Sequence, residues 1–435
     1  MTHPAHTHAH RSFYRVTLAV LLSALFLPPV GCNSRTTRTA PRSATLTDAT
    51  GPIAAEFTDD KVIIEAMING TGPHRLLLDT GYTTSSIAPE IAARIGISPY
   101  ASIRSVDAHG NRGSSPLARA DTVRLGGLEL RGVPIKIDTL PPLITEGSGL
   151  VGVAGYNLFG AYTLDIDYPN HTVKVTDERL PIDGTLPLSL DGGRNPFVLA
   201  EFRLPGDTDS HEDGIHETEM LVDTGSQAQL SLSGLRVSLY ADHEQAAQGG
   251  AVMSANGDIR PAMFARLEYD LFLGAPTATR VTALIEKQSA YYFSGAAELG
   301  AALMRHFRVT LDPVNKRARF LAPEGEPFVE MPVHRIHGFT AERIDEQTIA
   351  VESVIDGSPA QSAGLRAGDR VLSIDDRAPG EMIGPIQDPS VVDRRFVIER
   401  DGERIELRIG LQQLIPEPDN YQMMRERSPK ANPAR

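Results

Sequence analysis

One six-residue pattern occurs twice in this chain, and the two copies are 144 residues apart. Residues 76–81 have the sequence LLLDTG and residues 220–225 have the sequence MLVDTG, so three apolar residues precede Asp-Thr-Gly in both copies. A second match follows each copy, because Gly155 lies 76 residues after the first aspartate and Gly300 lies 77 residues after the second. Agreement over such a length predicts a duplicated domain, and 435 residues leave room for two such lobes and further modules.

Within each copy the apolar pattern is typical of short strands. Lys61–Ile68 and Arg75–Leu78 flank a turn-rich connection, and the second of these segments leads directly into an aspartate. In the second copy Phe197–Leu204 and Met220–Val222 flank a longer polar insert, Pro205–Thr218. Short helical patterns occur at Pro89–Ile95 and Ala296–Arg305. The sequence therefore predicts a fold that is mostly β with small helices.

The paired triplets, each after an apolar strand and each near the start of an equivalent half, resemble the aspartic proteases, and most closely the retropepsin-like branch fused into one chain. The resemblance implies two tandem acid-protease β lobes, at 56–180 and 185–323, that form a pseudo-twofold bilobed domain. It also implies hydrolysis of peptide bonds in protein or peptide substrates, with Asp79 and Asp223 as the catalytic residues. Because both triplets lie in one chain, we expect a monomer.

The chemistry needs two carboxyl groups because they share a proton. Like charges about 3 Å apart cannot both ionise, so one apparent pKa falls and the other rises. The ionised carboxylate deprotonates a water molecule and the protonated carboxyl group hydrogen-bonds the scissile carbonyl, so neither a metal nor a cofactor is required. By the resemblance, Thr80 and Thr224 hydrogen-bond across the pseudo-twofold axis, while Gly81 and Gly225 let the backbone approach the carboxylates.

The residue after each triplet differs between the copies. The family places a small residue there, often one whose hydroxyl donates to the aspartate, and Ser226 fits this pattern whereas Tyr82 does not. Without that hydroxyl donor the ionised form of Asp79 is less stabilised. We therefore expect Asp79 to carry the shared proton more often than Asp223.

A hairpin that covers the substrate is expected midway through each half. Glycine-centred turns lie at suitable offsets, since Gly110 follows the first aspartate by 31 residues and Gly257 follows the second by 34 residues. The resemblance makes His109 and Gly110, and Asn256 and Gly257, the candidates for the flap tips. Such turns are also common in other β proteins, so an ordinary hairpin remains the alternative.

The N-terminal residues predict export. Residues 1–31 carry Arg11 and Arg15 without any acidic residue, and Val16–Leu27 is an apolar run too short to span a bilayer as a helix. The run ends before Cys32, the only cysteine, which lies where a bacterial lipoprotein signal would be cut and lipidated. We expect a periplasmic or outer membrane-anchored protein whose only membrane attachment is this lipid; simple secretion is the alternative. Residues 33–50 fit a flexible tether.

Composition excludes several other classes of protein. The formal charge is −13, and removal of the two signal-segment arginines makes it −15, so the surface repels phosphate backbones and nucleic acid is not expected as a partner. One cysteine excludes an intrachain disulfide framework and thiolate zinc clusters. The segment His216–Glu219 lacks the second histidine of a zincin helix, and no nucleophile elbow, Walker loop or dinucleotide fingerprint is present.

A further module follows the second lobe. Residues 357–374 contain a Ser-Pro helix start, a Gly-Leu-Arg-Ala-Gly-Asp segment and an apolar strand, and they strongly resemble bacterial PDZ domains. The resemblance implies a PDZ domain over 334–411, a C-terminal peptide ligand, and a carboxylate-binding loop at His337, Gly338 and Phe339. The groove helix would lie in 380–393, where two prolines shorten or displace it, so a packing role is the alternative. Residues 412–435 are expected to form a disordered tail.

Two functions are consistent with these observations. The first is a cell-envelope aspartic endopeptidase whose PDZ domain helps to select substrates. The second is a catalytically inactive peptide-binding protein that uses the cleft between the lobes and the PDZ groove. Tight turns favour Asp, Thr and Gly, so the repeated triplets are also consistent with an inactive scaffold. Burial of a carboxylate at a strand end is costly without a partner, however, and this favours a catalytic pair.

Overall fold

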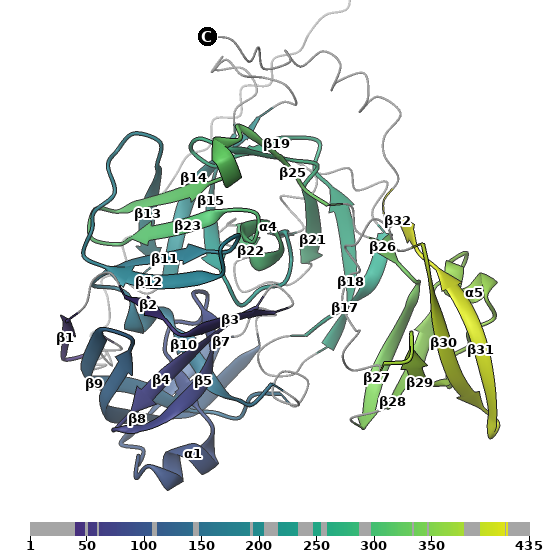
Figure 1. Ribbon diagram of the computed structural model, residues 1–435, viewed down its shortest axis with the longest axis horizontal. Coiled ribbons are helices and arrows are strands. Elements are labelled where there is room, and N and C mark those ends of the chain that lie inside the picture. The colour runs from purple at the N-terminus through teal and green to yellow at the C-terminus, as the bar shows by residue number, and fades with distance from the viewer. Residues whose placement is uncertain are drawn as a thin grey trace, which may run out of the picture. The chain divides into compact units, whose positions relative to one another are not determined.

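The structure, a computed structural model, describes residues 40–47, 51–58, 61–106, 111–141, 148–191, 195–203, 216–233, 247–253, 259–286, 297–332, 335–345, 348–377, 392–413 and 415. Cys32 and the signal segment, the four flap candidates His109, Gly110, Asn256 and Gly257, and most of the polar insert lie outside this part of the chain. Within it the fold is mostly β, as predicted (Figure 1). The helices found there are all too short to cross a membrane.

The first lobe is built around strand β5 (Thr71–Asp79). Leu76 and Leu78 lie in the main core, whereas Leu77 packs with Ile63 in a separate apolar cluster. A strand that is buried on both faces needs a continuous apolar run, which explains the three residues before the aspartate. The lobe contains β1 (Ser43–Leu46), β3 (Ala55–Thr58), β4 (Lys61–Ile68), β5, β6 (Ser86–Ile87), α1 (Pro89–Arg94), β7 (Ala101–Val106), β8 (Arg112–Leu125), β9 (Leu128–Ile137), β10 (Leu150–Gly155) and the 3₁₀ turn η1 (Tyr156–Leu158).

These strands form one sheet in the order β1-β9-β6-β10-β5-β4-β8-β7, with β3 paired to β4. Most neighbours are antiparallel, but β5 and β10 run parallel to each other, and β6 is antiparallel to β10. Parallel strands need a long connection, and here the segment between β5 and β10 supplies it. In the parallel register of these two strands, Asp79 at the end of β5 lies beside Gly155 at the end of β10.

The second lobe repeats this arrangement around β15 (His216–Asp223). Met220 and Val222 lie in the main core, and Leu221 packs with Phe197 in a separate cluster. Strand β22 (Ala297–Gly300) runs parallel to β15, and β16 (Leu230–Ser233) is antiparallel to β22. The other elements are β13 (Leu186–Asp191), β14 (Asn195–Arg203), β17 (Ala247–Met253), β18 (Ile259–Arg266), β19 (Asp270–Phe272), β20 (Thr277–Thr279), β21 (Thr282–Glu286), α4 (Ala301–Met304), β24 (Arg317–Leu321), the 3₁₀ turn η2 (Pro323–Gly325) and β25 (Phe328–Glu330).

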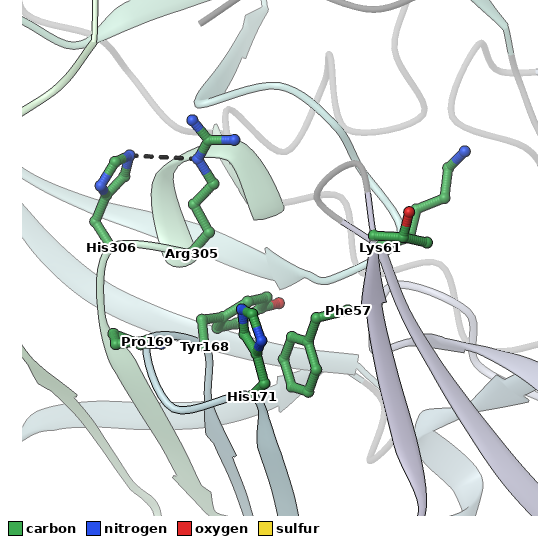
Figure 2. Close-up of a pocket in the computed structure, with 8 residues that line it drawn as sticks. Phe57, Lys61, Tyr168, Pro169, His171, Arg305 and His306 are labelled. Atoms are coloured by element: carbon green, nitrogen blue, oxygen red, sulfur yellow. Dashed lines mark hydrogen bonds between the residues drawn. The ribbon is translucent and has the colours of Figure 1, made fainter. Parts of the chain in front are cut away.

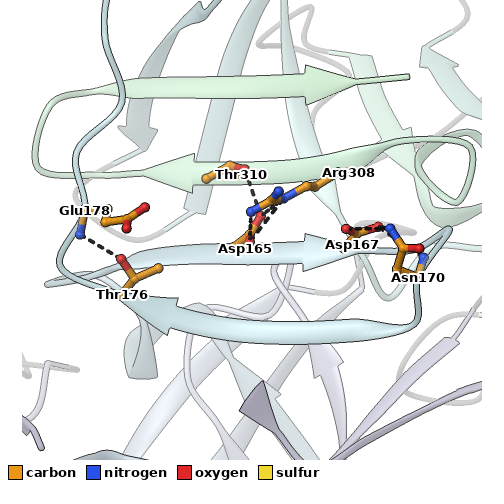
Figure 3. A network of polar contacts seen from close by, with 7 residues as sticks. All are labelled: Asp165, Asp167, Asn170, Thr176, Glu178, Arg308 and Thr310. Carbon is orange, nitrogen blue, oxygen red and sulfur yellow. Dashed lines mark hydrogen bonds and ion pairs between the residues drawn. The ribbon is translucent and has the colours of Figure 1, made fainter. Parts of the chain in front are cut away.

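A continuous run of strands joins the two lobes. Its order is β13-β24-β23-β11-β12-β2, in which β2 (Pro52–Ile53), β11 (Thr163–Asp167) and β12 (Thr172–Thr176) precede the second lobe and β23 (Arg308–Asp312) belongs to it. In the β11–β23 register, Asp165 lies opposite Thr310. The Thr310 hydroxyl donates to Asp165 at 2.9 Å and Arg308 pairs with it at 2.7 Å (Figure 3). This junction keeps the two triplet-bearing strands in one folded unit.

The C-terminal module has its own sheet and core. Strands β27 (Phe339–Asp345), β28 (Thr348–Val354), β29 (Arg370–Ile374), β30 (Asp393–Arg400) and β31 (Glu403–Gly410) pair in that order (Figure 1). The predicted Ser-Pro helix start is confirmed: α5 (Pro359–Ser362) is capped by Ser358, whose hydroxyl accepts from the Gln361 N–H. The helix ends before Gly364, which has the positive φ of a C-terminal glycine stop.

Four segments differ from the sequence-based predictions. Residues 43–46 of the predicted tether form β1, which covers the edge of β9 by antiparallel pairing. In the predicted tail, β32 (Gln412–Gln413) pairs with β26 (Arg335–Ile336). The predicted polar insert ends earlier than expected, because β15 begins at residue 216. The predicted helix at 296–305 is mainly wrong, since residues 297–300 extend as β22 and only 301–304 are helical.

Candidate active site

Each triplet aspartate lies at the end of a buried strand beside a glycine of the parallel neighbour. Asp79 lies opposite Gly155, and Asp223 lies opposite Gly300. Neither glycine could carry a side chain, because a Cβ on Gly155 would overlap the Tyr82 carbonyl and a Cβ on Gly300 would overlap the Ala228 carbonyl, each in the turn of its own lobe. The nearly equal spacings in the sequence, 76 and 77 residues, therefore reflect the same close approach of turn and strand in both lobes.

The two aspartates meet across the lobes. Their carboxyl groups hydrogen-bond each other, although the residues are 144 positions apart in the chain. The triplet glycines make this approach feasible: a Cβ on Gly81 would overlap the Asp223 carboxyl group, and one on Gly225 would lie 2.5 Å from Cγ of Asp79. The positions predicted as catalytic and as close-approach glycines thus form one site.

The triplet threonines link the two lobes beneath the carboxyl groups. The Thr80 hydroxyl donates to the Val222 carbonyl at 2.5 Å and accepts from the Thr224 N–H at 3.1 Å. The Thr224 hydroxyl donates to the Leu78 carbonyl at 2.8 Å and accepts from the Thr80 N–H at 3.0 Å. Both threonines are fully buried, so all four bonds are shielded from water. This reciprocal pattern fixes the distance between the two aspartate strands.

The two carboxyl groups have unequal surroundings. Burial raises the pKa of Asp79 well above its ordinary value, and the neighbouring Asp223 raises it further. Burial also raises the pKa of Asp223, but backbone N–H groups of Gly225, Ser226 and Gly81 donate to it and oppose the rise. Asp79 receives one backbone donor, the Tyr82 N–H at 2.9 Å. The shared proton therefore resides mainly on Asp79 and the negative charge mainly on Asp223.

The contribution of Ser226 differs from the prediction. Its backbone N–H, and not its hydroxyl, is the group that stabilises ionised Asp223. The Ser226 hydroxyl instead accepts from the Ala228 N–H at 3.5 Å, within its own turn. The preference of the proton for Asp79 thus rests on the number of backbone donors rather than on the absence of a hydroxyl at residue 82.

Asn195 is a site residue that the sequence analysis missed. It begins β14 of the second lobe and is buried, with 4% of its surface exposed. Its side-chain amide donates to the carbonyl of Gly81, and it lies 3.4 Å from the carbonyl of Thr80. It therefore supports the first triplet from the opposite lobe. No local pattern around Asn195 signals this role, because the contact spans 114 residues of sequence.

A second missed feature is a polar cluster beside the first triplet. The ammonium group of Lys136 lies 3.7 Å from the centre of the Tyr82 ring and 3.8 Å from a carboxylate oxygen of Asp138. Asp138 also accepts from the Tyr82 hydroxyl at 3.3 Å and from the Ser115 hydroxyl at 3.1 Å. A lysine inside the otherwise apolar segment 133–137 is the sequence signal that could have indicated it.

The predicted carboxylate loop of the C-terminal module lies at the start of its first long strand. Phe339 begins β27, and Gly338 has a φ of +92°, where a Cβ would overlap Ser358. The His337 carbonyl accepts from the Ala360 N–H at 2.9 Å, which ties the loop to α5. Most of the predicted groove helix, in residues 380–393, lies outside the described part of the chain.

Two segments of the chain match known protein families. Residues 64–154, which include the first triplet, match the family model described as aspartyl protease, and residues 350–409 match a PDZ domain model. Among solved structures, an aspartic proteinase from Irpex lacteus is 13% identical, with a TM-score of 0.36, and the alignment covers 65% of this chain and 98% of that one. No curated protein matches the chain.

Fold, site and family models together define the class. The chain has an aspartic protease-like fold, followed by a PDZ domain. The second triplet lies outside the matched residues, and its place in the site rests on the hydrogen bonds described above. Among the described residues, no cluster of His, Cys, Asp and Glu is arranged to hold a metal ion.

Proposed function

We propose that this protein is an aspartic endopeptidase that hydrolyses peptide bonds with a water molecule activated between Asp79 and Asp223. The observation that carries the proposal is the buried carboxyl pair, which shares a proton and has unequal donors on its two members. A structural turn does not require two desolvated carboxyl groups in contact, whereas activation of water by one carboxylate and protonation of the carbonyl by the other uses such a pair.

The unequal surroundings assign the two roles. Ionised Asp223 takes a proton from the water, whose oxygen attacks the scissile carbonyl carbon, while Asp79 donates its proton to the carbonyl oxygen. The resulting tetrahedral intermediate collapses as the C–N bond breaks, and the proton held by Asp223 passes to the leaving amine. Asp79 recovers its proton from the intermediate's hydroxyl group, so the dyad returns to its starting state without a covalent intermediate.

The decisive experiment is cleavage of a peptide library by the protein from residue 33 onward, between about pH 3 and about pH 8. Asp79→Asn and Asp223→Asn should each abolish cleavage, while Asp121→Asn, at an exposed aspartate, serves as the matched control. Cleavage that survives in either dyad variant would contradict the proposal. If the wild-type protein does not cut at any pH, the inactive peptide-binding function takes its place, and retention of peptides by the protein becomes the measurement.

We further propose that the protein acts in the cell envelope and that its PDZ domain helps to select substrates. Support for export comes from the signal segment and the position of Cys32, and incorporation of labelled palmitate that is lost in Cys32→Ser would test lipidation. For substrate selection, a peptide with a free C-terminal carboxylate should be cleaved with a lower KM than the same peptide amidated at its C-terminus. Equal KM values would contradict carboxylate recognition.

A further inference from the structure

A buried lysine lies next to the proposed catalytic pair and takes no part in the mechanism above. Lys136 belongs to β9, and only 7% of its side chain is exposed. Its backbone pairs with Ser86 of β6 on one side and Leu117 of β8 on the other, so the backbone position is fixed by the sheet. A buried ammonium group is costly unless other groups compensate for its lost hydration.

Two groups compensate for the lost hydration of Lys136, the Tyr82 ring and the Asp138 carboxylate. The Tyr82 ring lies 3.7 Å from the ammonium nitrogen, at a distance where a cation and an aromatic face attract each other. Asp138, 3.8 Å from that nitrogen, also accepts from the hydroxyl of Tyr82. The Tyr82 backbone N–H is the donor to Asp79. One residue therefore connects Lys136 to the carboxyl group that holds the proton.

The second lobe has no such charge at the equivalent position. In the first lobe Ser86 pairs with Lys136 on one neighbouring strand and Val153 on the other. In the second lobe Ser231 pairs with Leu284 and Glu298 in the same way. Strand register thus places Leu284 where the first lobe has Lys136. The cation is a feature of one lobe only and is not required by the fold that both lobes share.

We propose that Lys136 is a positioning residue for the dyad: its buried ammonium group holds Tyr82, the backbone donor to Asp79, and its charge stabilises the single negative charge of the carboxyl pair. The proposal rests on the proposed peptidase function. Within the described part of the chain, the acidic neighbours of Lys136 are Asp138 and Asp79, and the third titratable neighbour is the Tyr82 phenol.

The proposed effect of Lys136 is limited to the pH range in which its amine is protonated. Burial lowers the pKa of Lys136 to about 8, although attraction to Asp138 and Asp79 opposes that decrease. Lys136 is therefore mainly charged at neutral pH and loses its charge as the pH rises through about 8. Because charge attraction is mutual, ionised Lys136 lowers both pKa values of the carboxyl pair, whichever oxygen carries the proton.

The first test compares pH profiles of kcat/KM. Lys136→Met keeps an unbranched, flexible side chain, one atom shorter, without the charge, and both limbs of the profile should move upward, the acidic limb by about one pH unit. Lys136→Arg restores a permanent charge and should return the acidic limb to its wild-type position. Leu284→Met, at the equivalent position of the second lobe, is the matched control and should leave both limbs in place. An acidic limb that is the same in wild type and Lys136→Met would overturn the proposal.

A loss of stability in Lys136→Met can be distinguished from the expected change in the pH profile. Asp138 keeps 32% of its side chain exposed and keeps two hydroxyl donors, so Lys136→Met does not leave a fully buried, unpaired charge. A merely structural role for Lys136 would lower activity at every pH and lower thermal stability, and Lys136→Met would not move the limbs. That outcome would also contradict the proposal.

A second measurement needs no turnover. In protein labelled with ¹³C at the aspartate carboxyl groups, the Asp79 signal is identified by its loss in Asp79→Asn, and its titration reports the pair directly. The first midpoint of this titration should lie higher in Lys136→Met than in wild type and Lys136→Arg. If the protein cuts no peptide but this shift is present, the peptidase function fails while the role of Lys136 stands. If cleavage occurs and the midpoint does not move, the proposal for Lys136 fails alone.

Discussion

Replacing Thr80 by valine tests whether the reciprocal threonine bonds hold the two lobes in register. Valine has nearly the same shape but cannot hydrogen-bond, so the change removes two contacts without creating a large cavity. The Val222 carbonyl loses its donor at 2.5 Å, and the Thr224 N–H loses its acceptor at 3.1 Å. Thr80 is 0% exposed, so water cannot readily replace either partner.

The expected loss follows from counting the groups left unpaired. A buried polar group without a partner costs about 1–3 kcal/mol, so two such groups lower the free energy of unfolding by about 2–6 kcal/mol. Thr84 provides the control, since it is also buried but its hydroxyl has no hydrogen-bond partner among the described residues. Thr84→Val should therefore change the unfolding free energy by less than about 1 kcal/mol, or increase it.

Urea unfolding followed by far-UV circular dichroism measures both variants, since the chain has no tryptophan to report by fluorescence. In Thr80→Val the transition of the protease-like lobes should move to lower urea, and any separate PDZ transition should stay in place. Activity should fall mainly through kcat, by about 10- to 100-fold, because a small displacement of a catalytic group is costly. Equal destabilisation by Thr80→Val and Thr84→Val would refute the hydrogen-bond argument.

Three further outcomes are expected. Asn195→Ala removes the amide donor to Gly81 and should lower the unfolding free energy by about 1–3 kcal/mol, as urea unfolding would show. Asp79→Asn should stabilise the fold at neutral pH. The pKa of Asp79 is raised in the folded state, so the wild-type protein loses stability as the pH rises above the pKa of an aspartate in the unfolded chain. The gain should vanish below about pH 3, where the unfolding curves of the two proteins should coincide. Burial lowers the pKa of His306 from 6.5 to about 4, so between these two pH values the unfolded state binds more protons than the folded state. The free energy of unfolding should therefore fall by up to about 3 kcal/mol as the pH drops from 6.5 to about 4. In His306→Gln that part of the pH dependence should be absent, and an unchanged slope would contradict it.

Much of the fold could be predicted because its signals are local. The segment Lys61–Ile68 was bounded correctly as β4, since a hydrophobic run ends at a glycine turn. The helix at 296–305 was largely wrong because small apolar residues suit a helix and a buried strand equally, and the parallel pairing with β15 decides the outcome. Strand β1 could not be predicted, because its stability comes from the edge of β9 and not from its own residues.

The candidate site likewise contains residues that local sequence patterns predict and residues that they do not. Asp, Thr and Gly of each triplet are adjacent in sequence, and their repetition identified both halves of the dyad before any geometry was known. Asn195 reaches the first triplet from another strand, and no local pattern indicates that contact. Lys136 also lies on another strand, and its only sequence signal is its place inside an otherwise apolar segment. For Tyr82 the sequence predicts only the lack of a side-chain donor to Asp79, whereas the Tyr82 ring and backbone N–H are the groups that connect Lys136 to the dyad.

Two alike lobes would by themselves give two alike carboxyl groups, yet water activation needs one base and one acid at the same moment. In this chain the backbone turns resolve the choice, because Asp223 receives more N–H donors than Asp79. Residues that differ between the lobes then act on one side only: Asn195 supports the first triplet from the second lobe, and Lys136 contacts the Tyr82 ring where the second lobe has Leu284. The features that both lobes share bring the carboxyl groups together, the unequal backbone donors place the proton mainly on Asp79, and in our proposal Lys136 sets the pH range of the pair. Substitutions in the threonine links should therefore lower activity at every pH, whereas substitutions at Lys136 should move the pH profile.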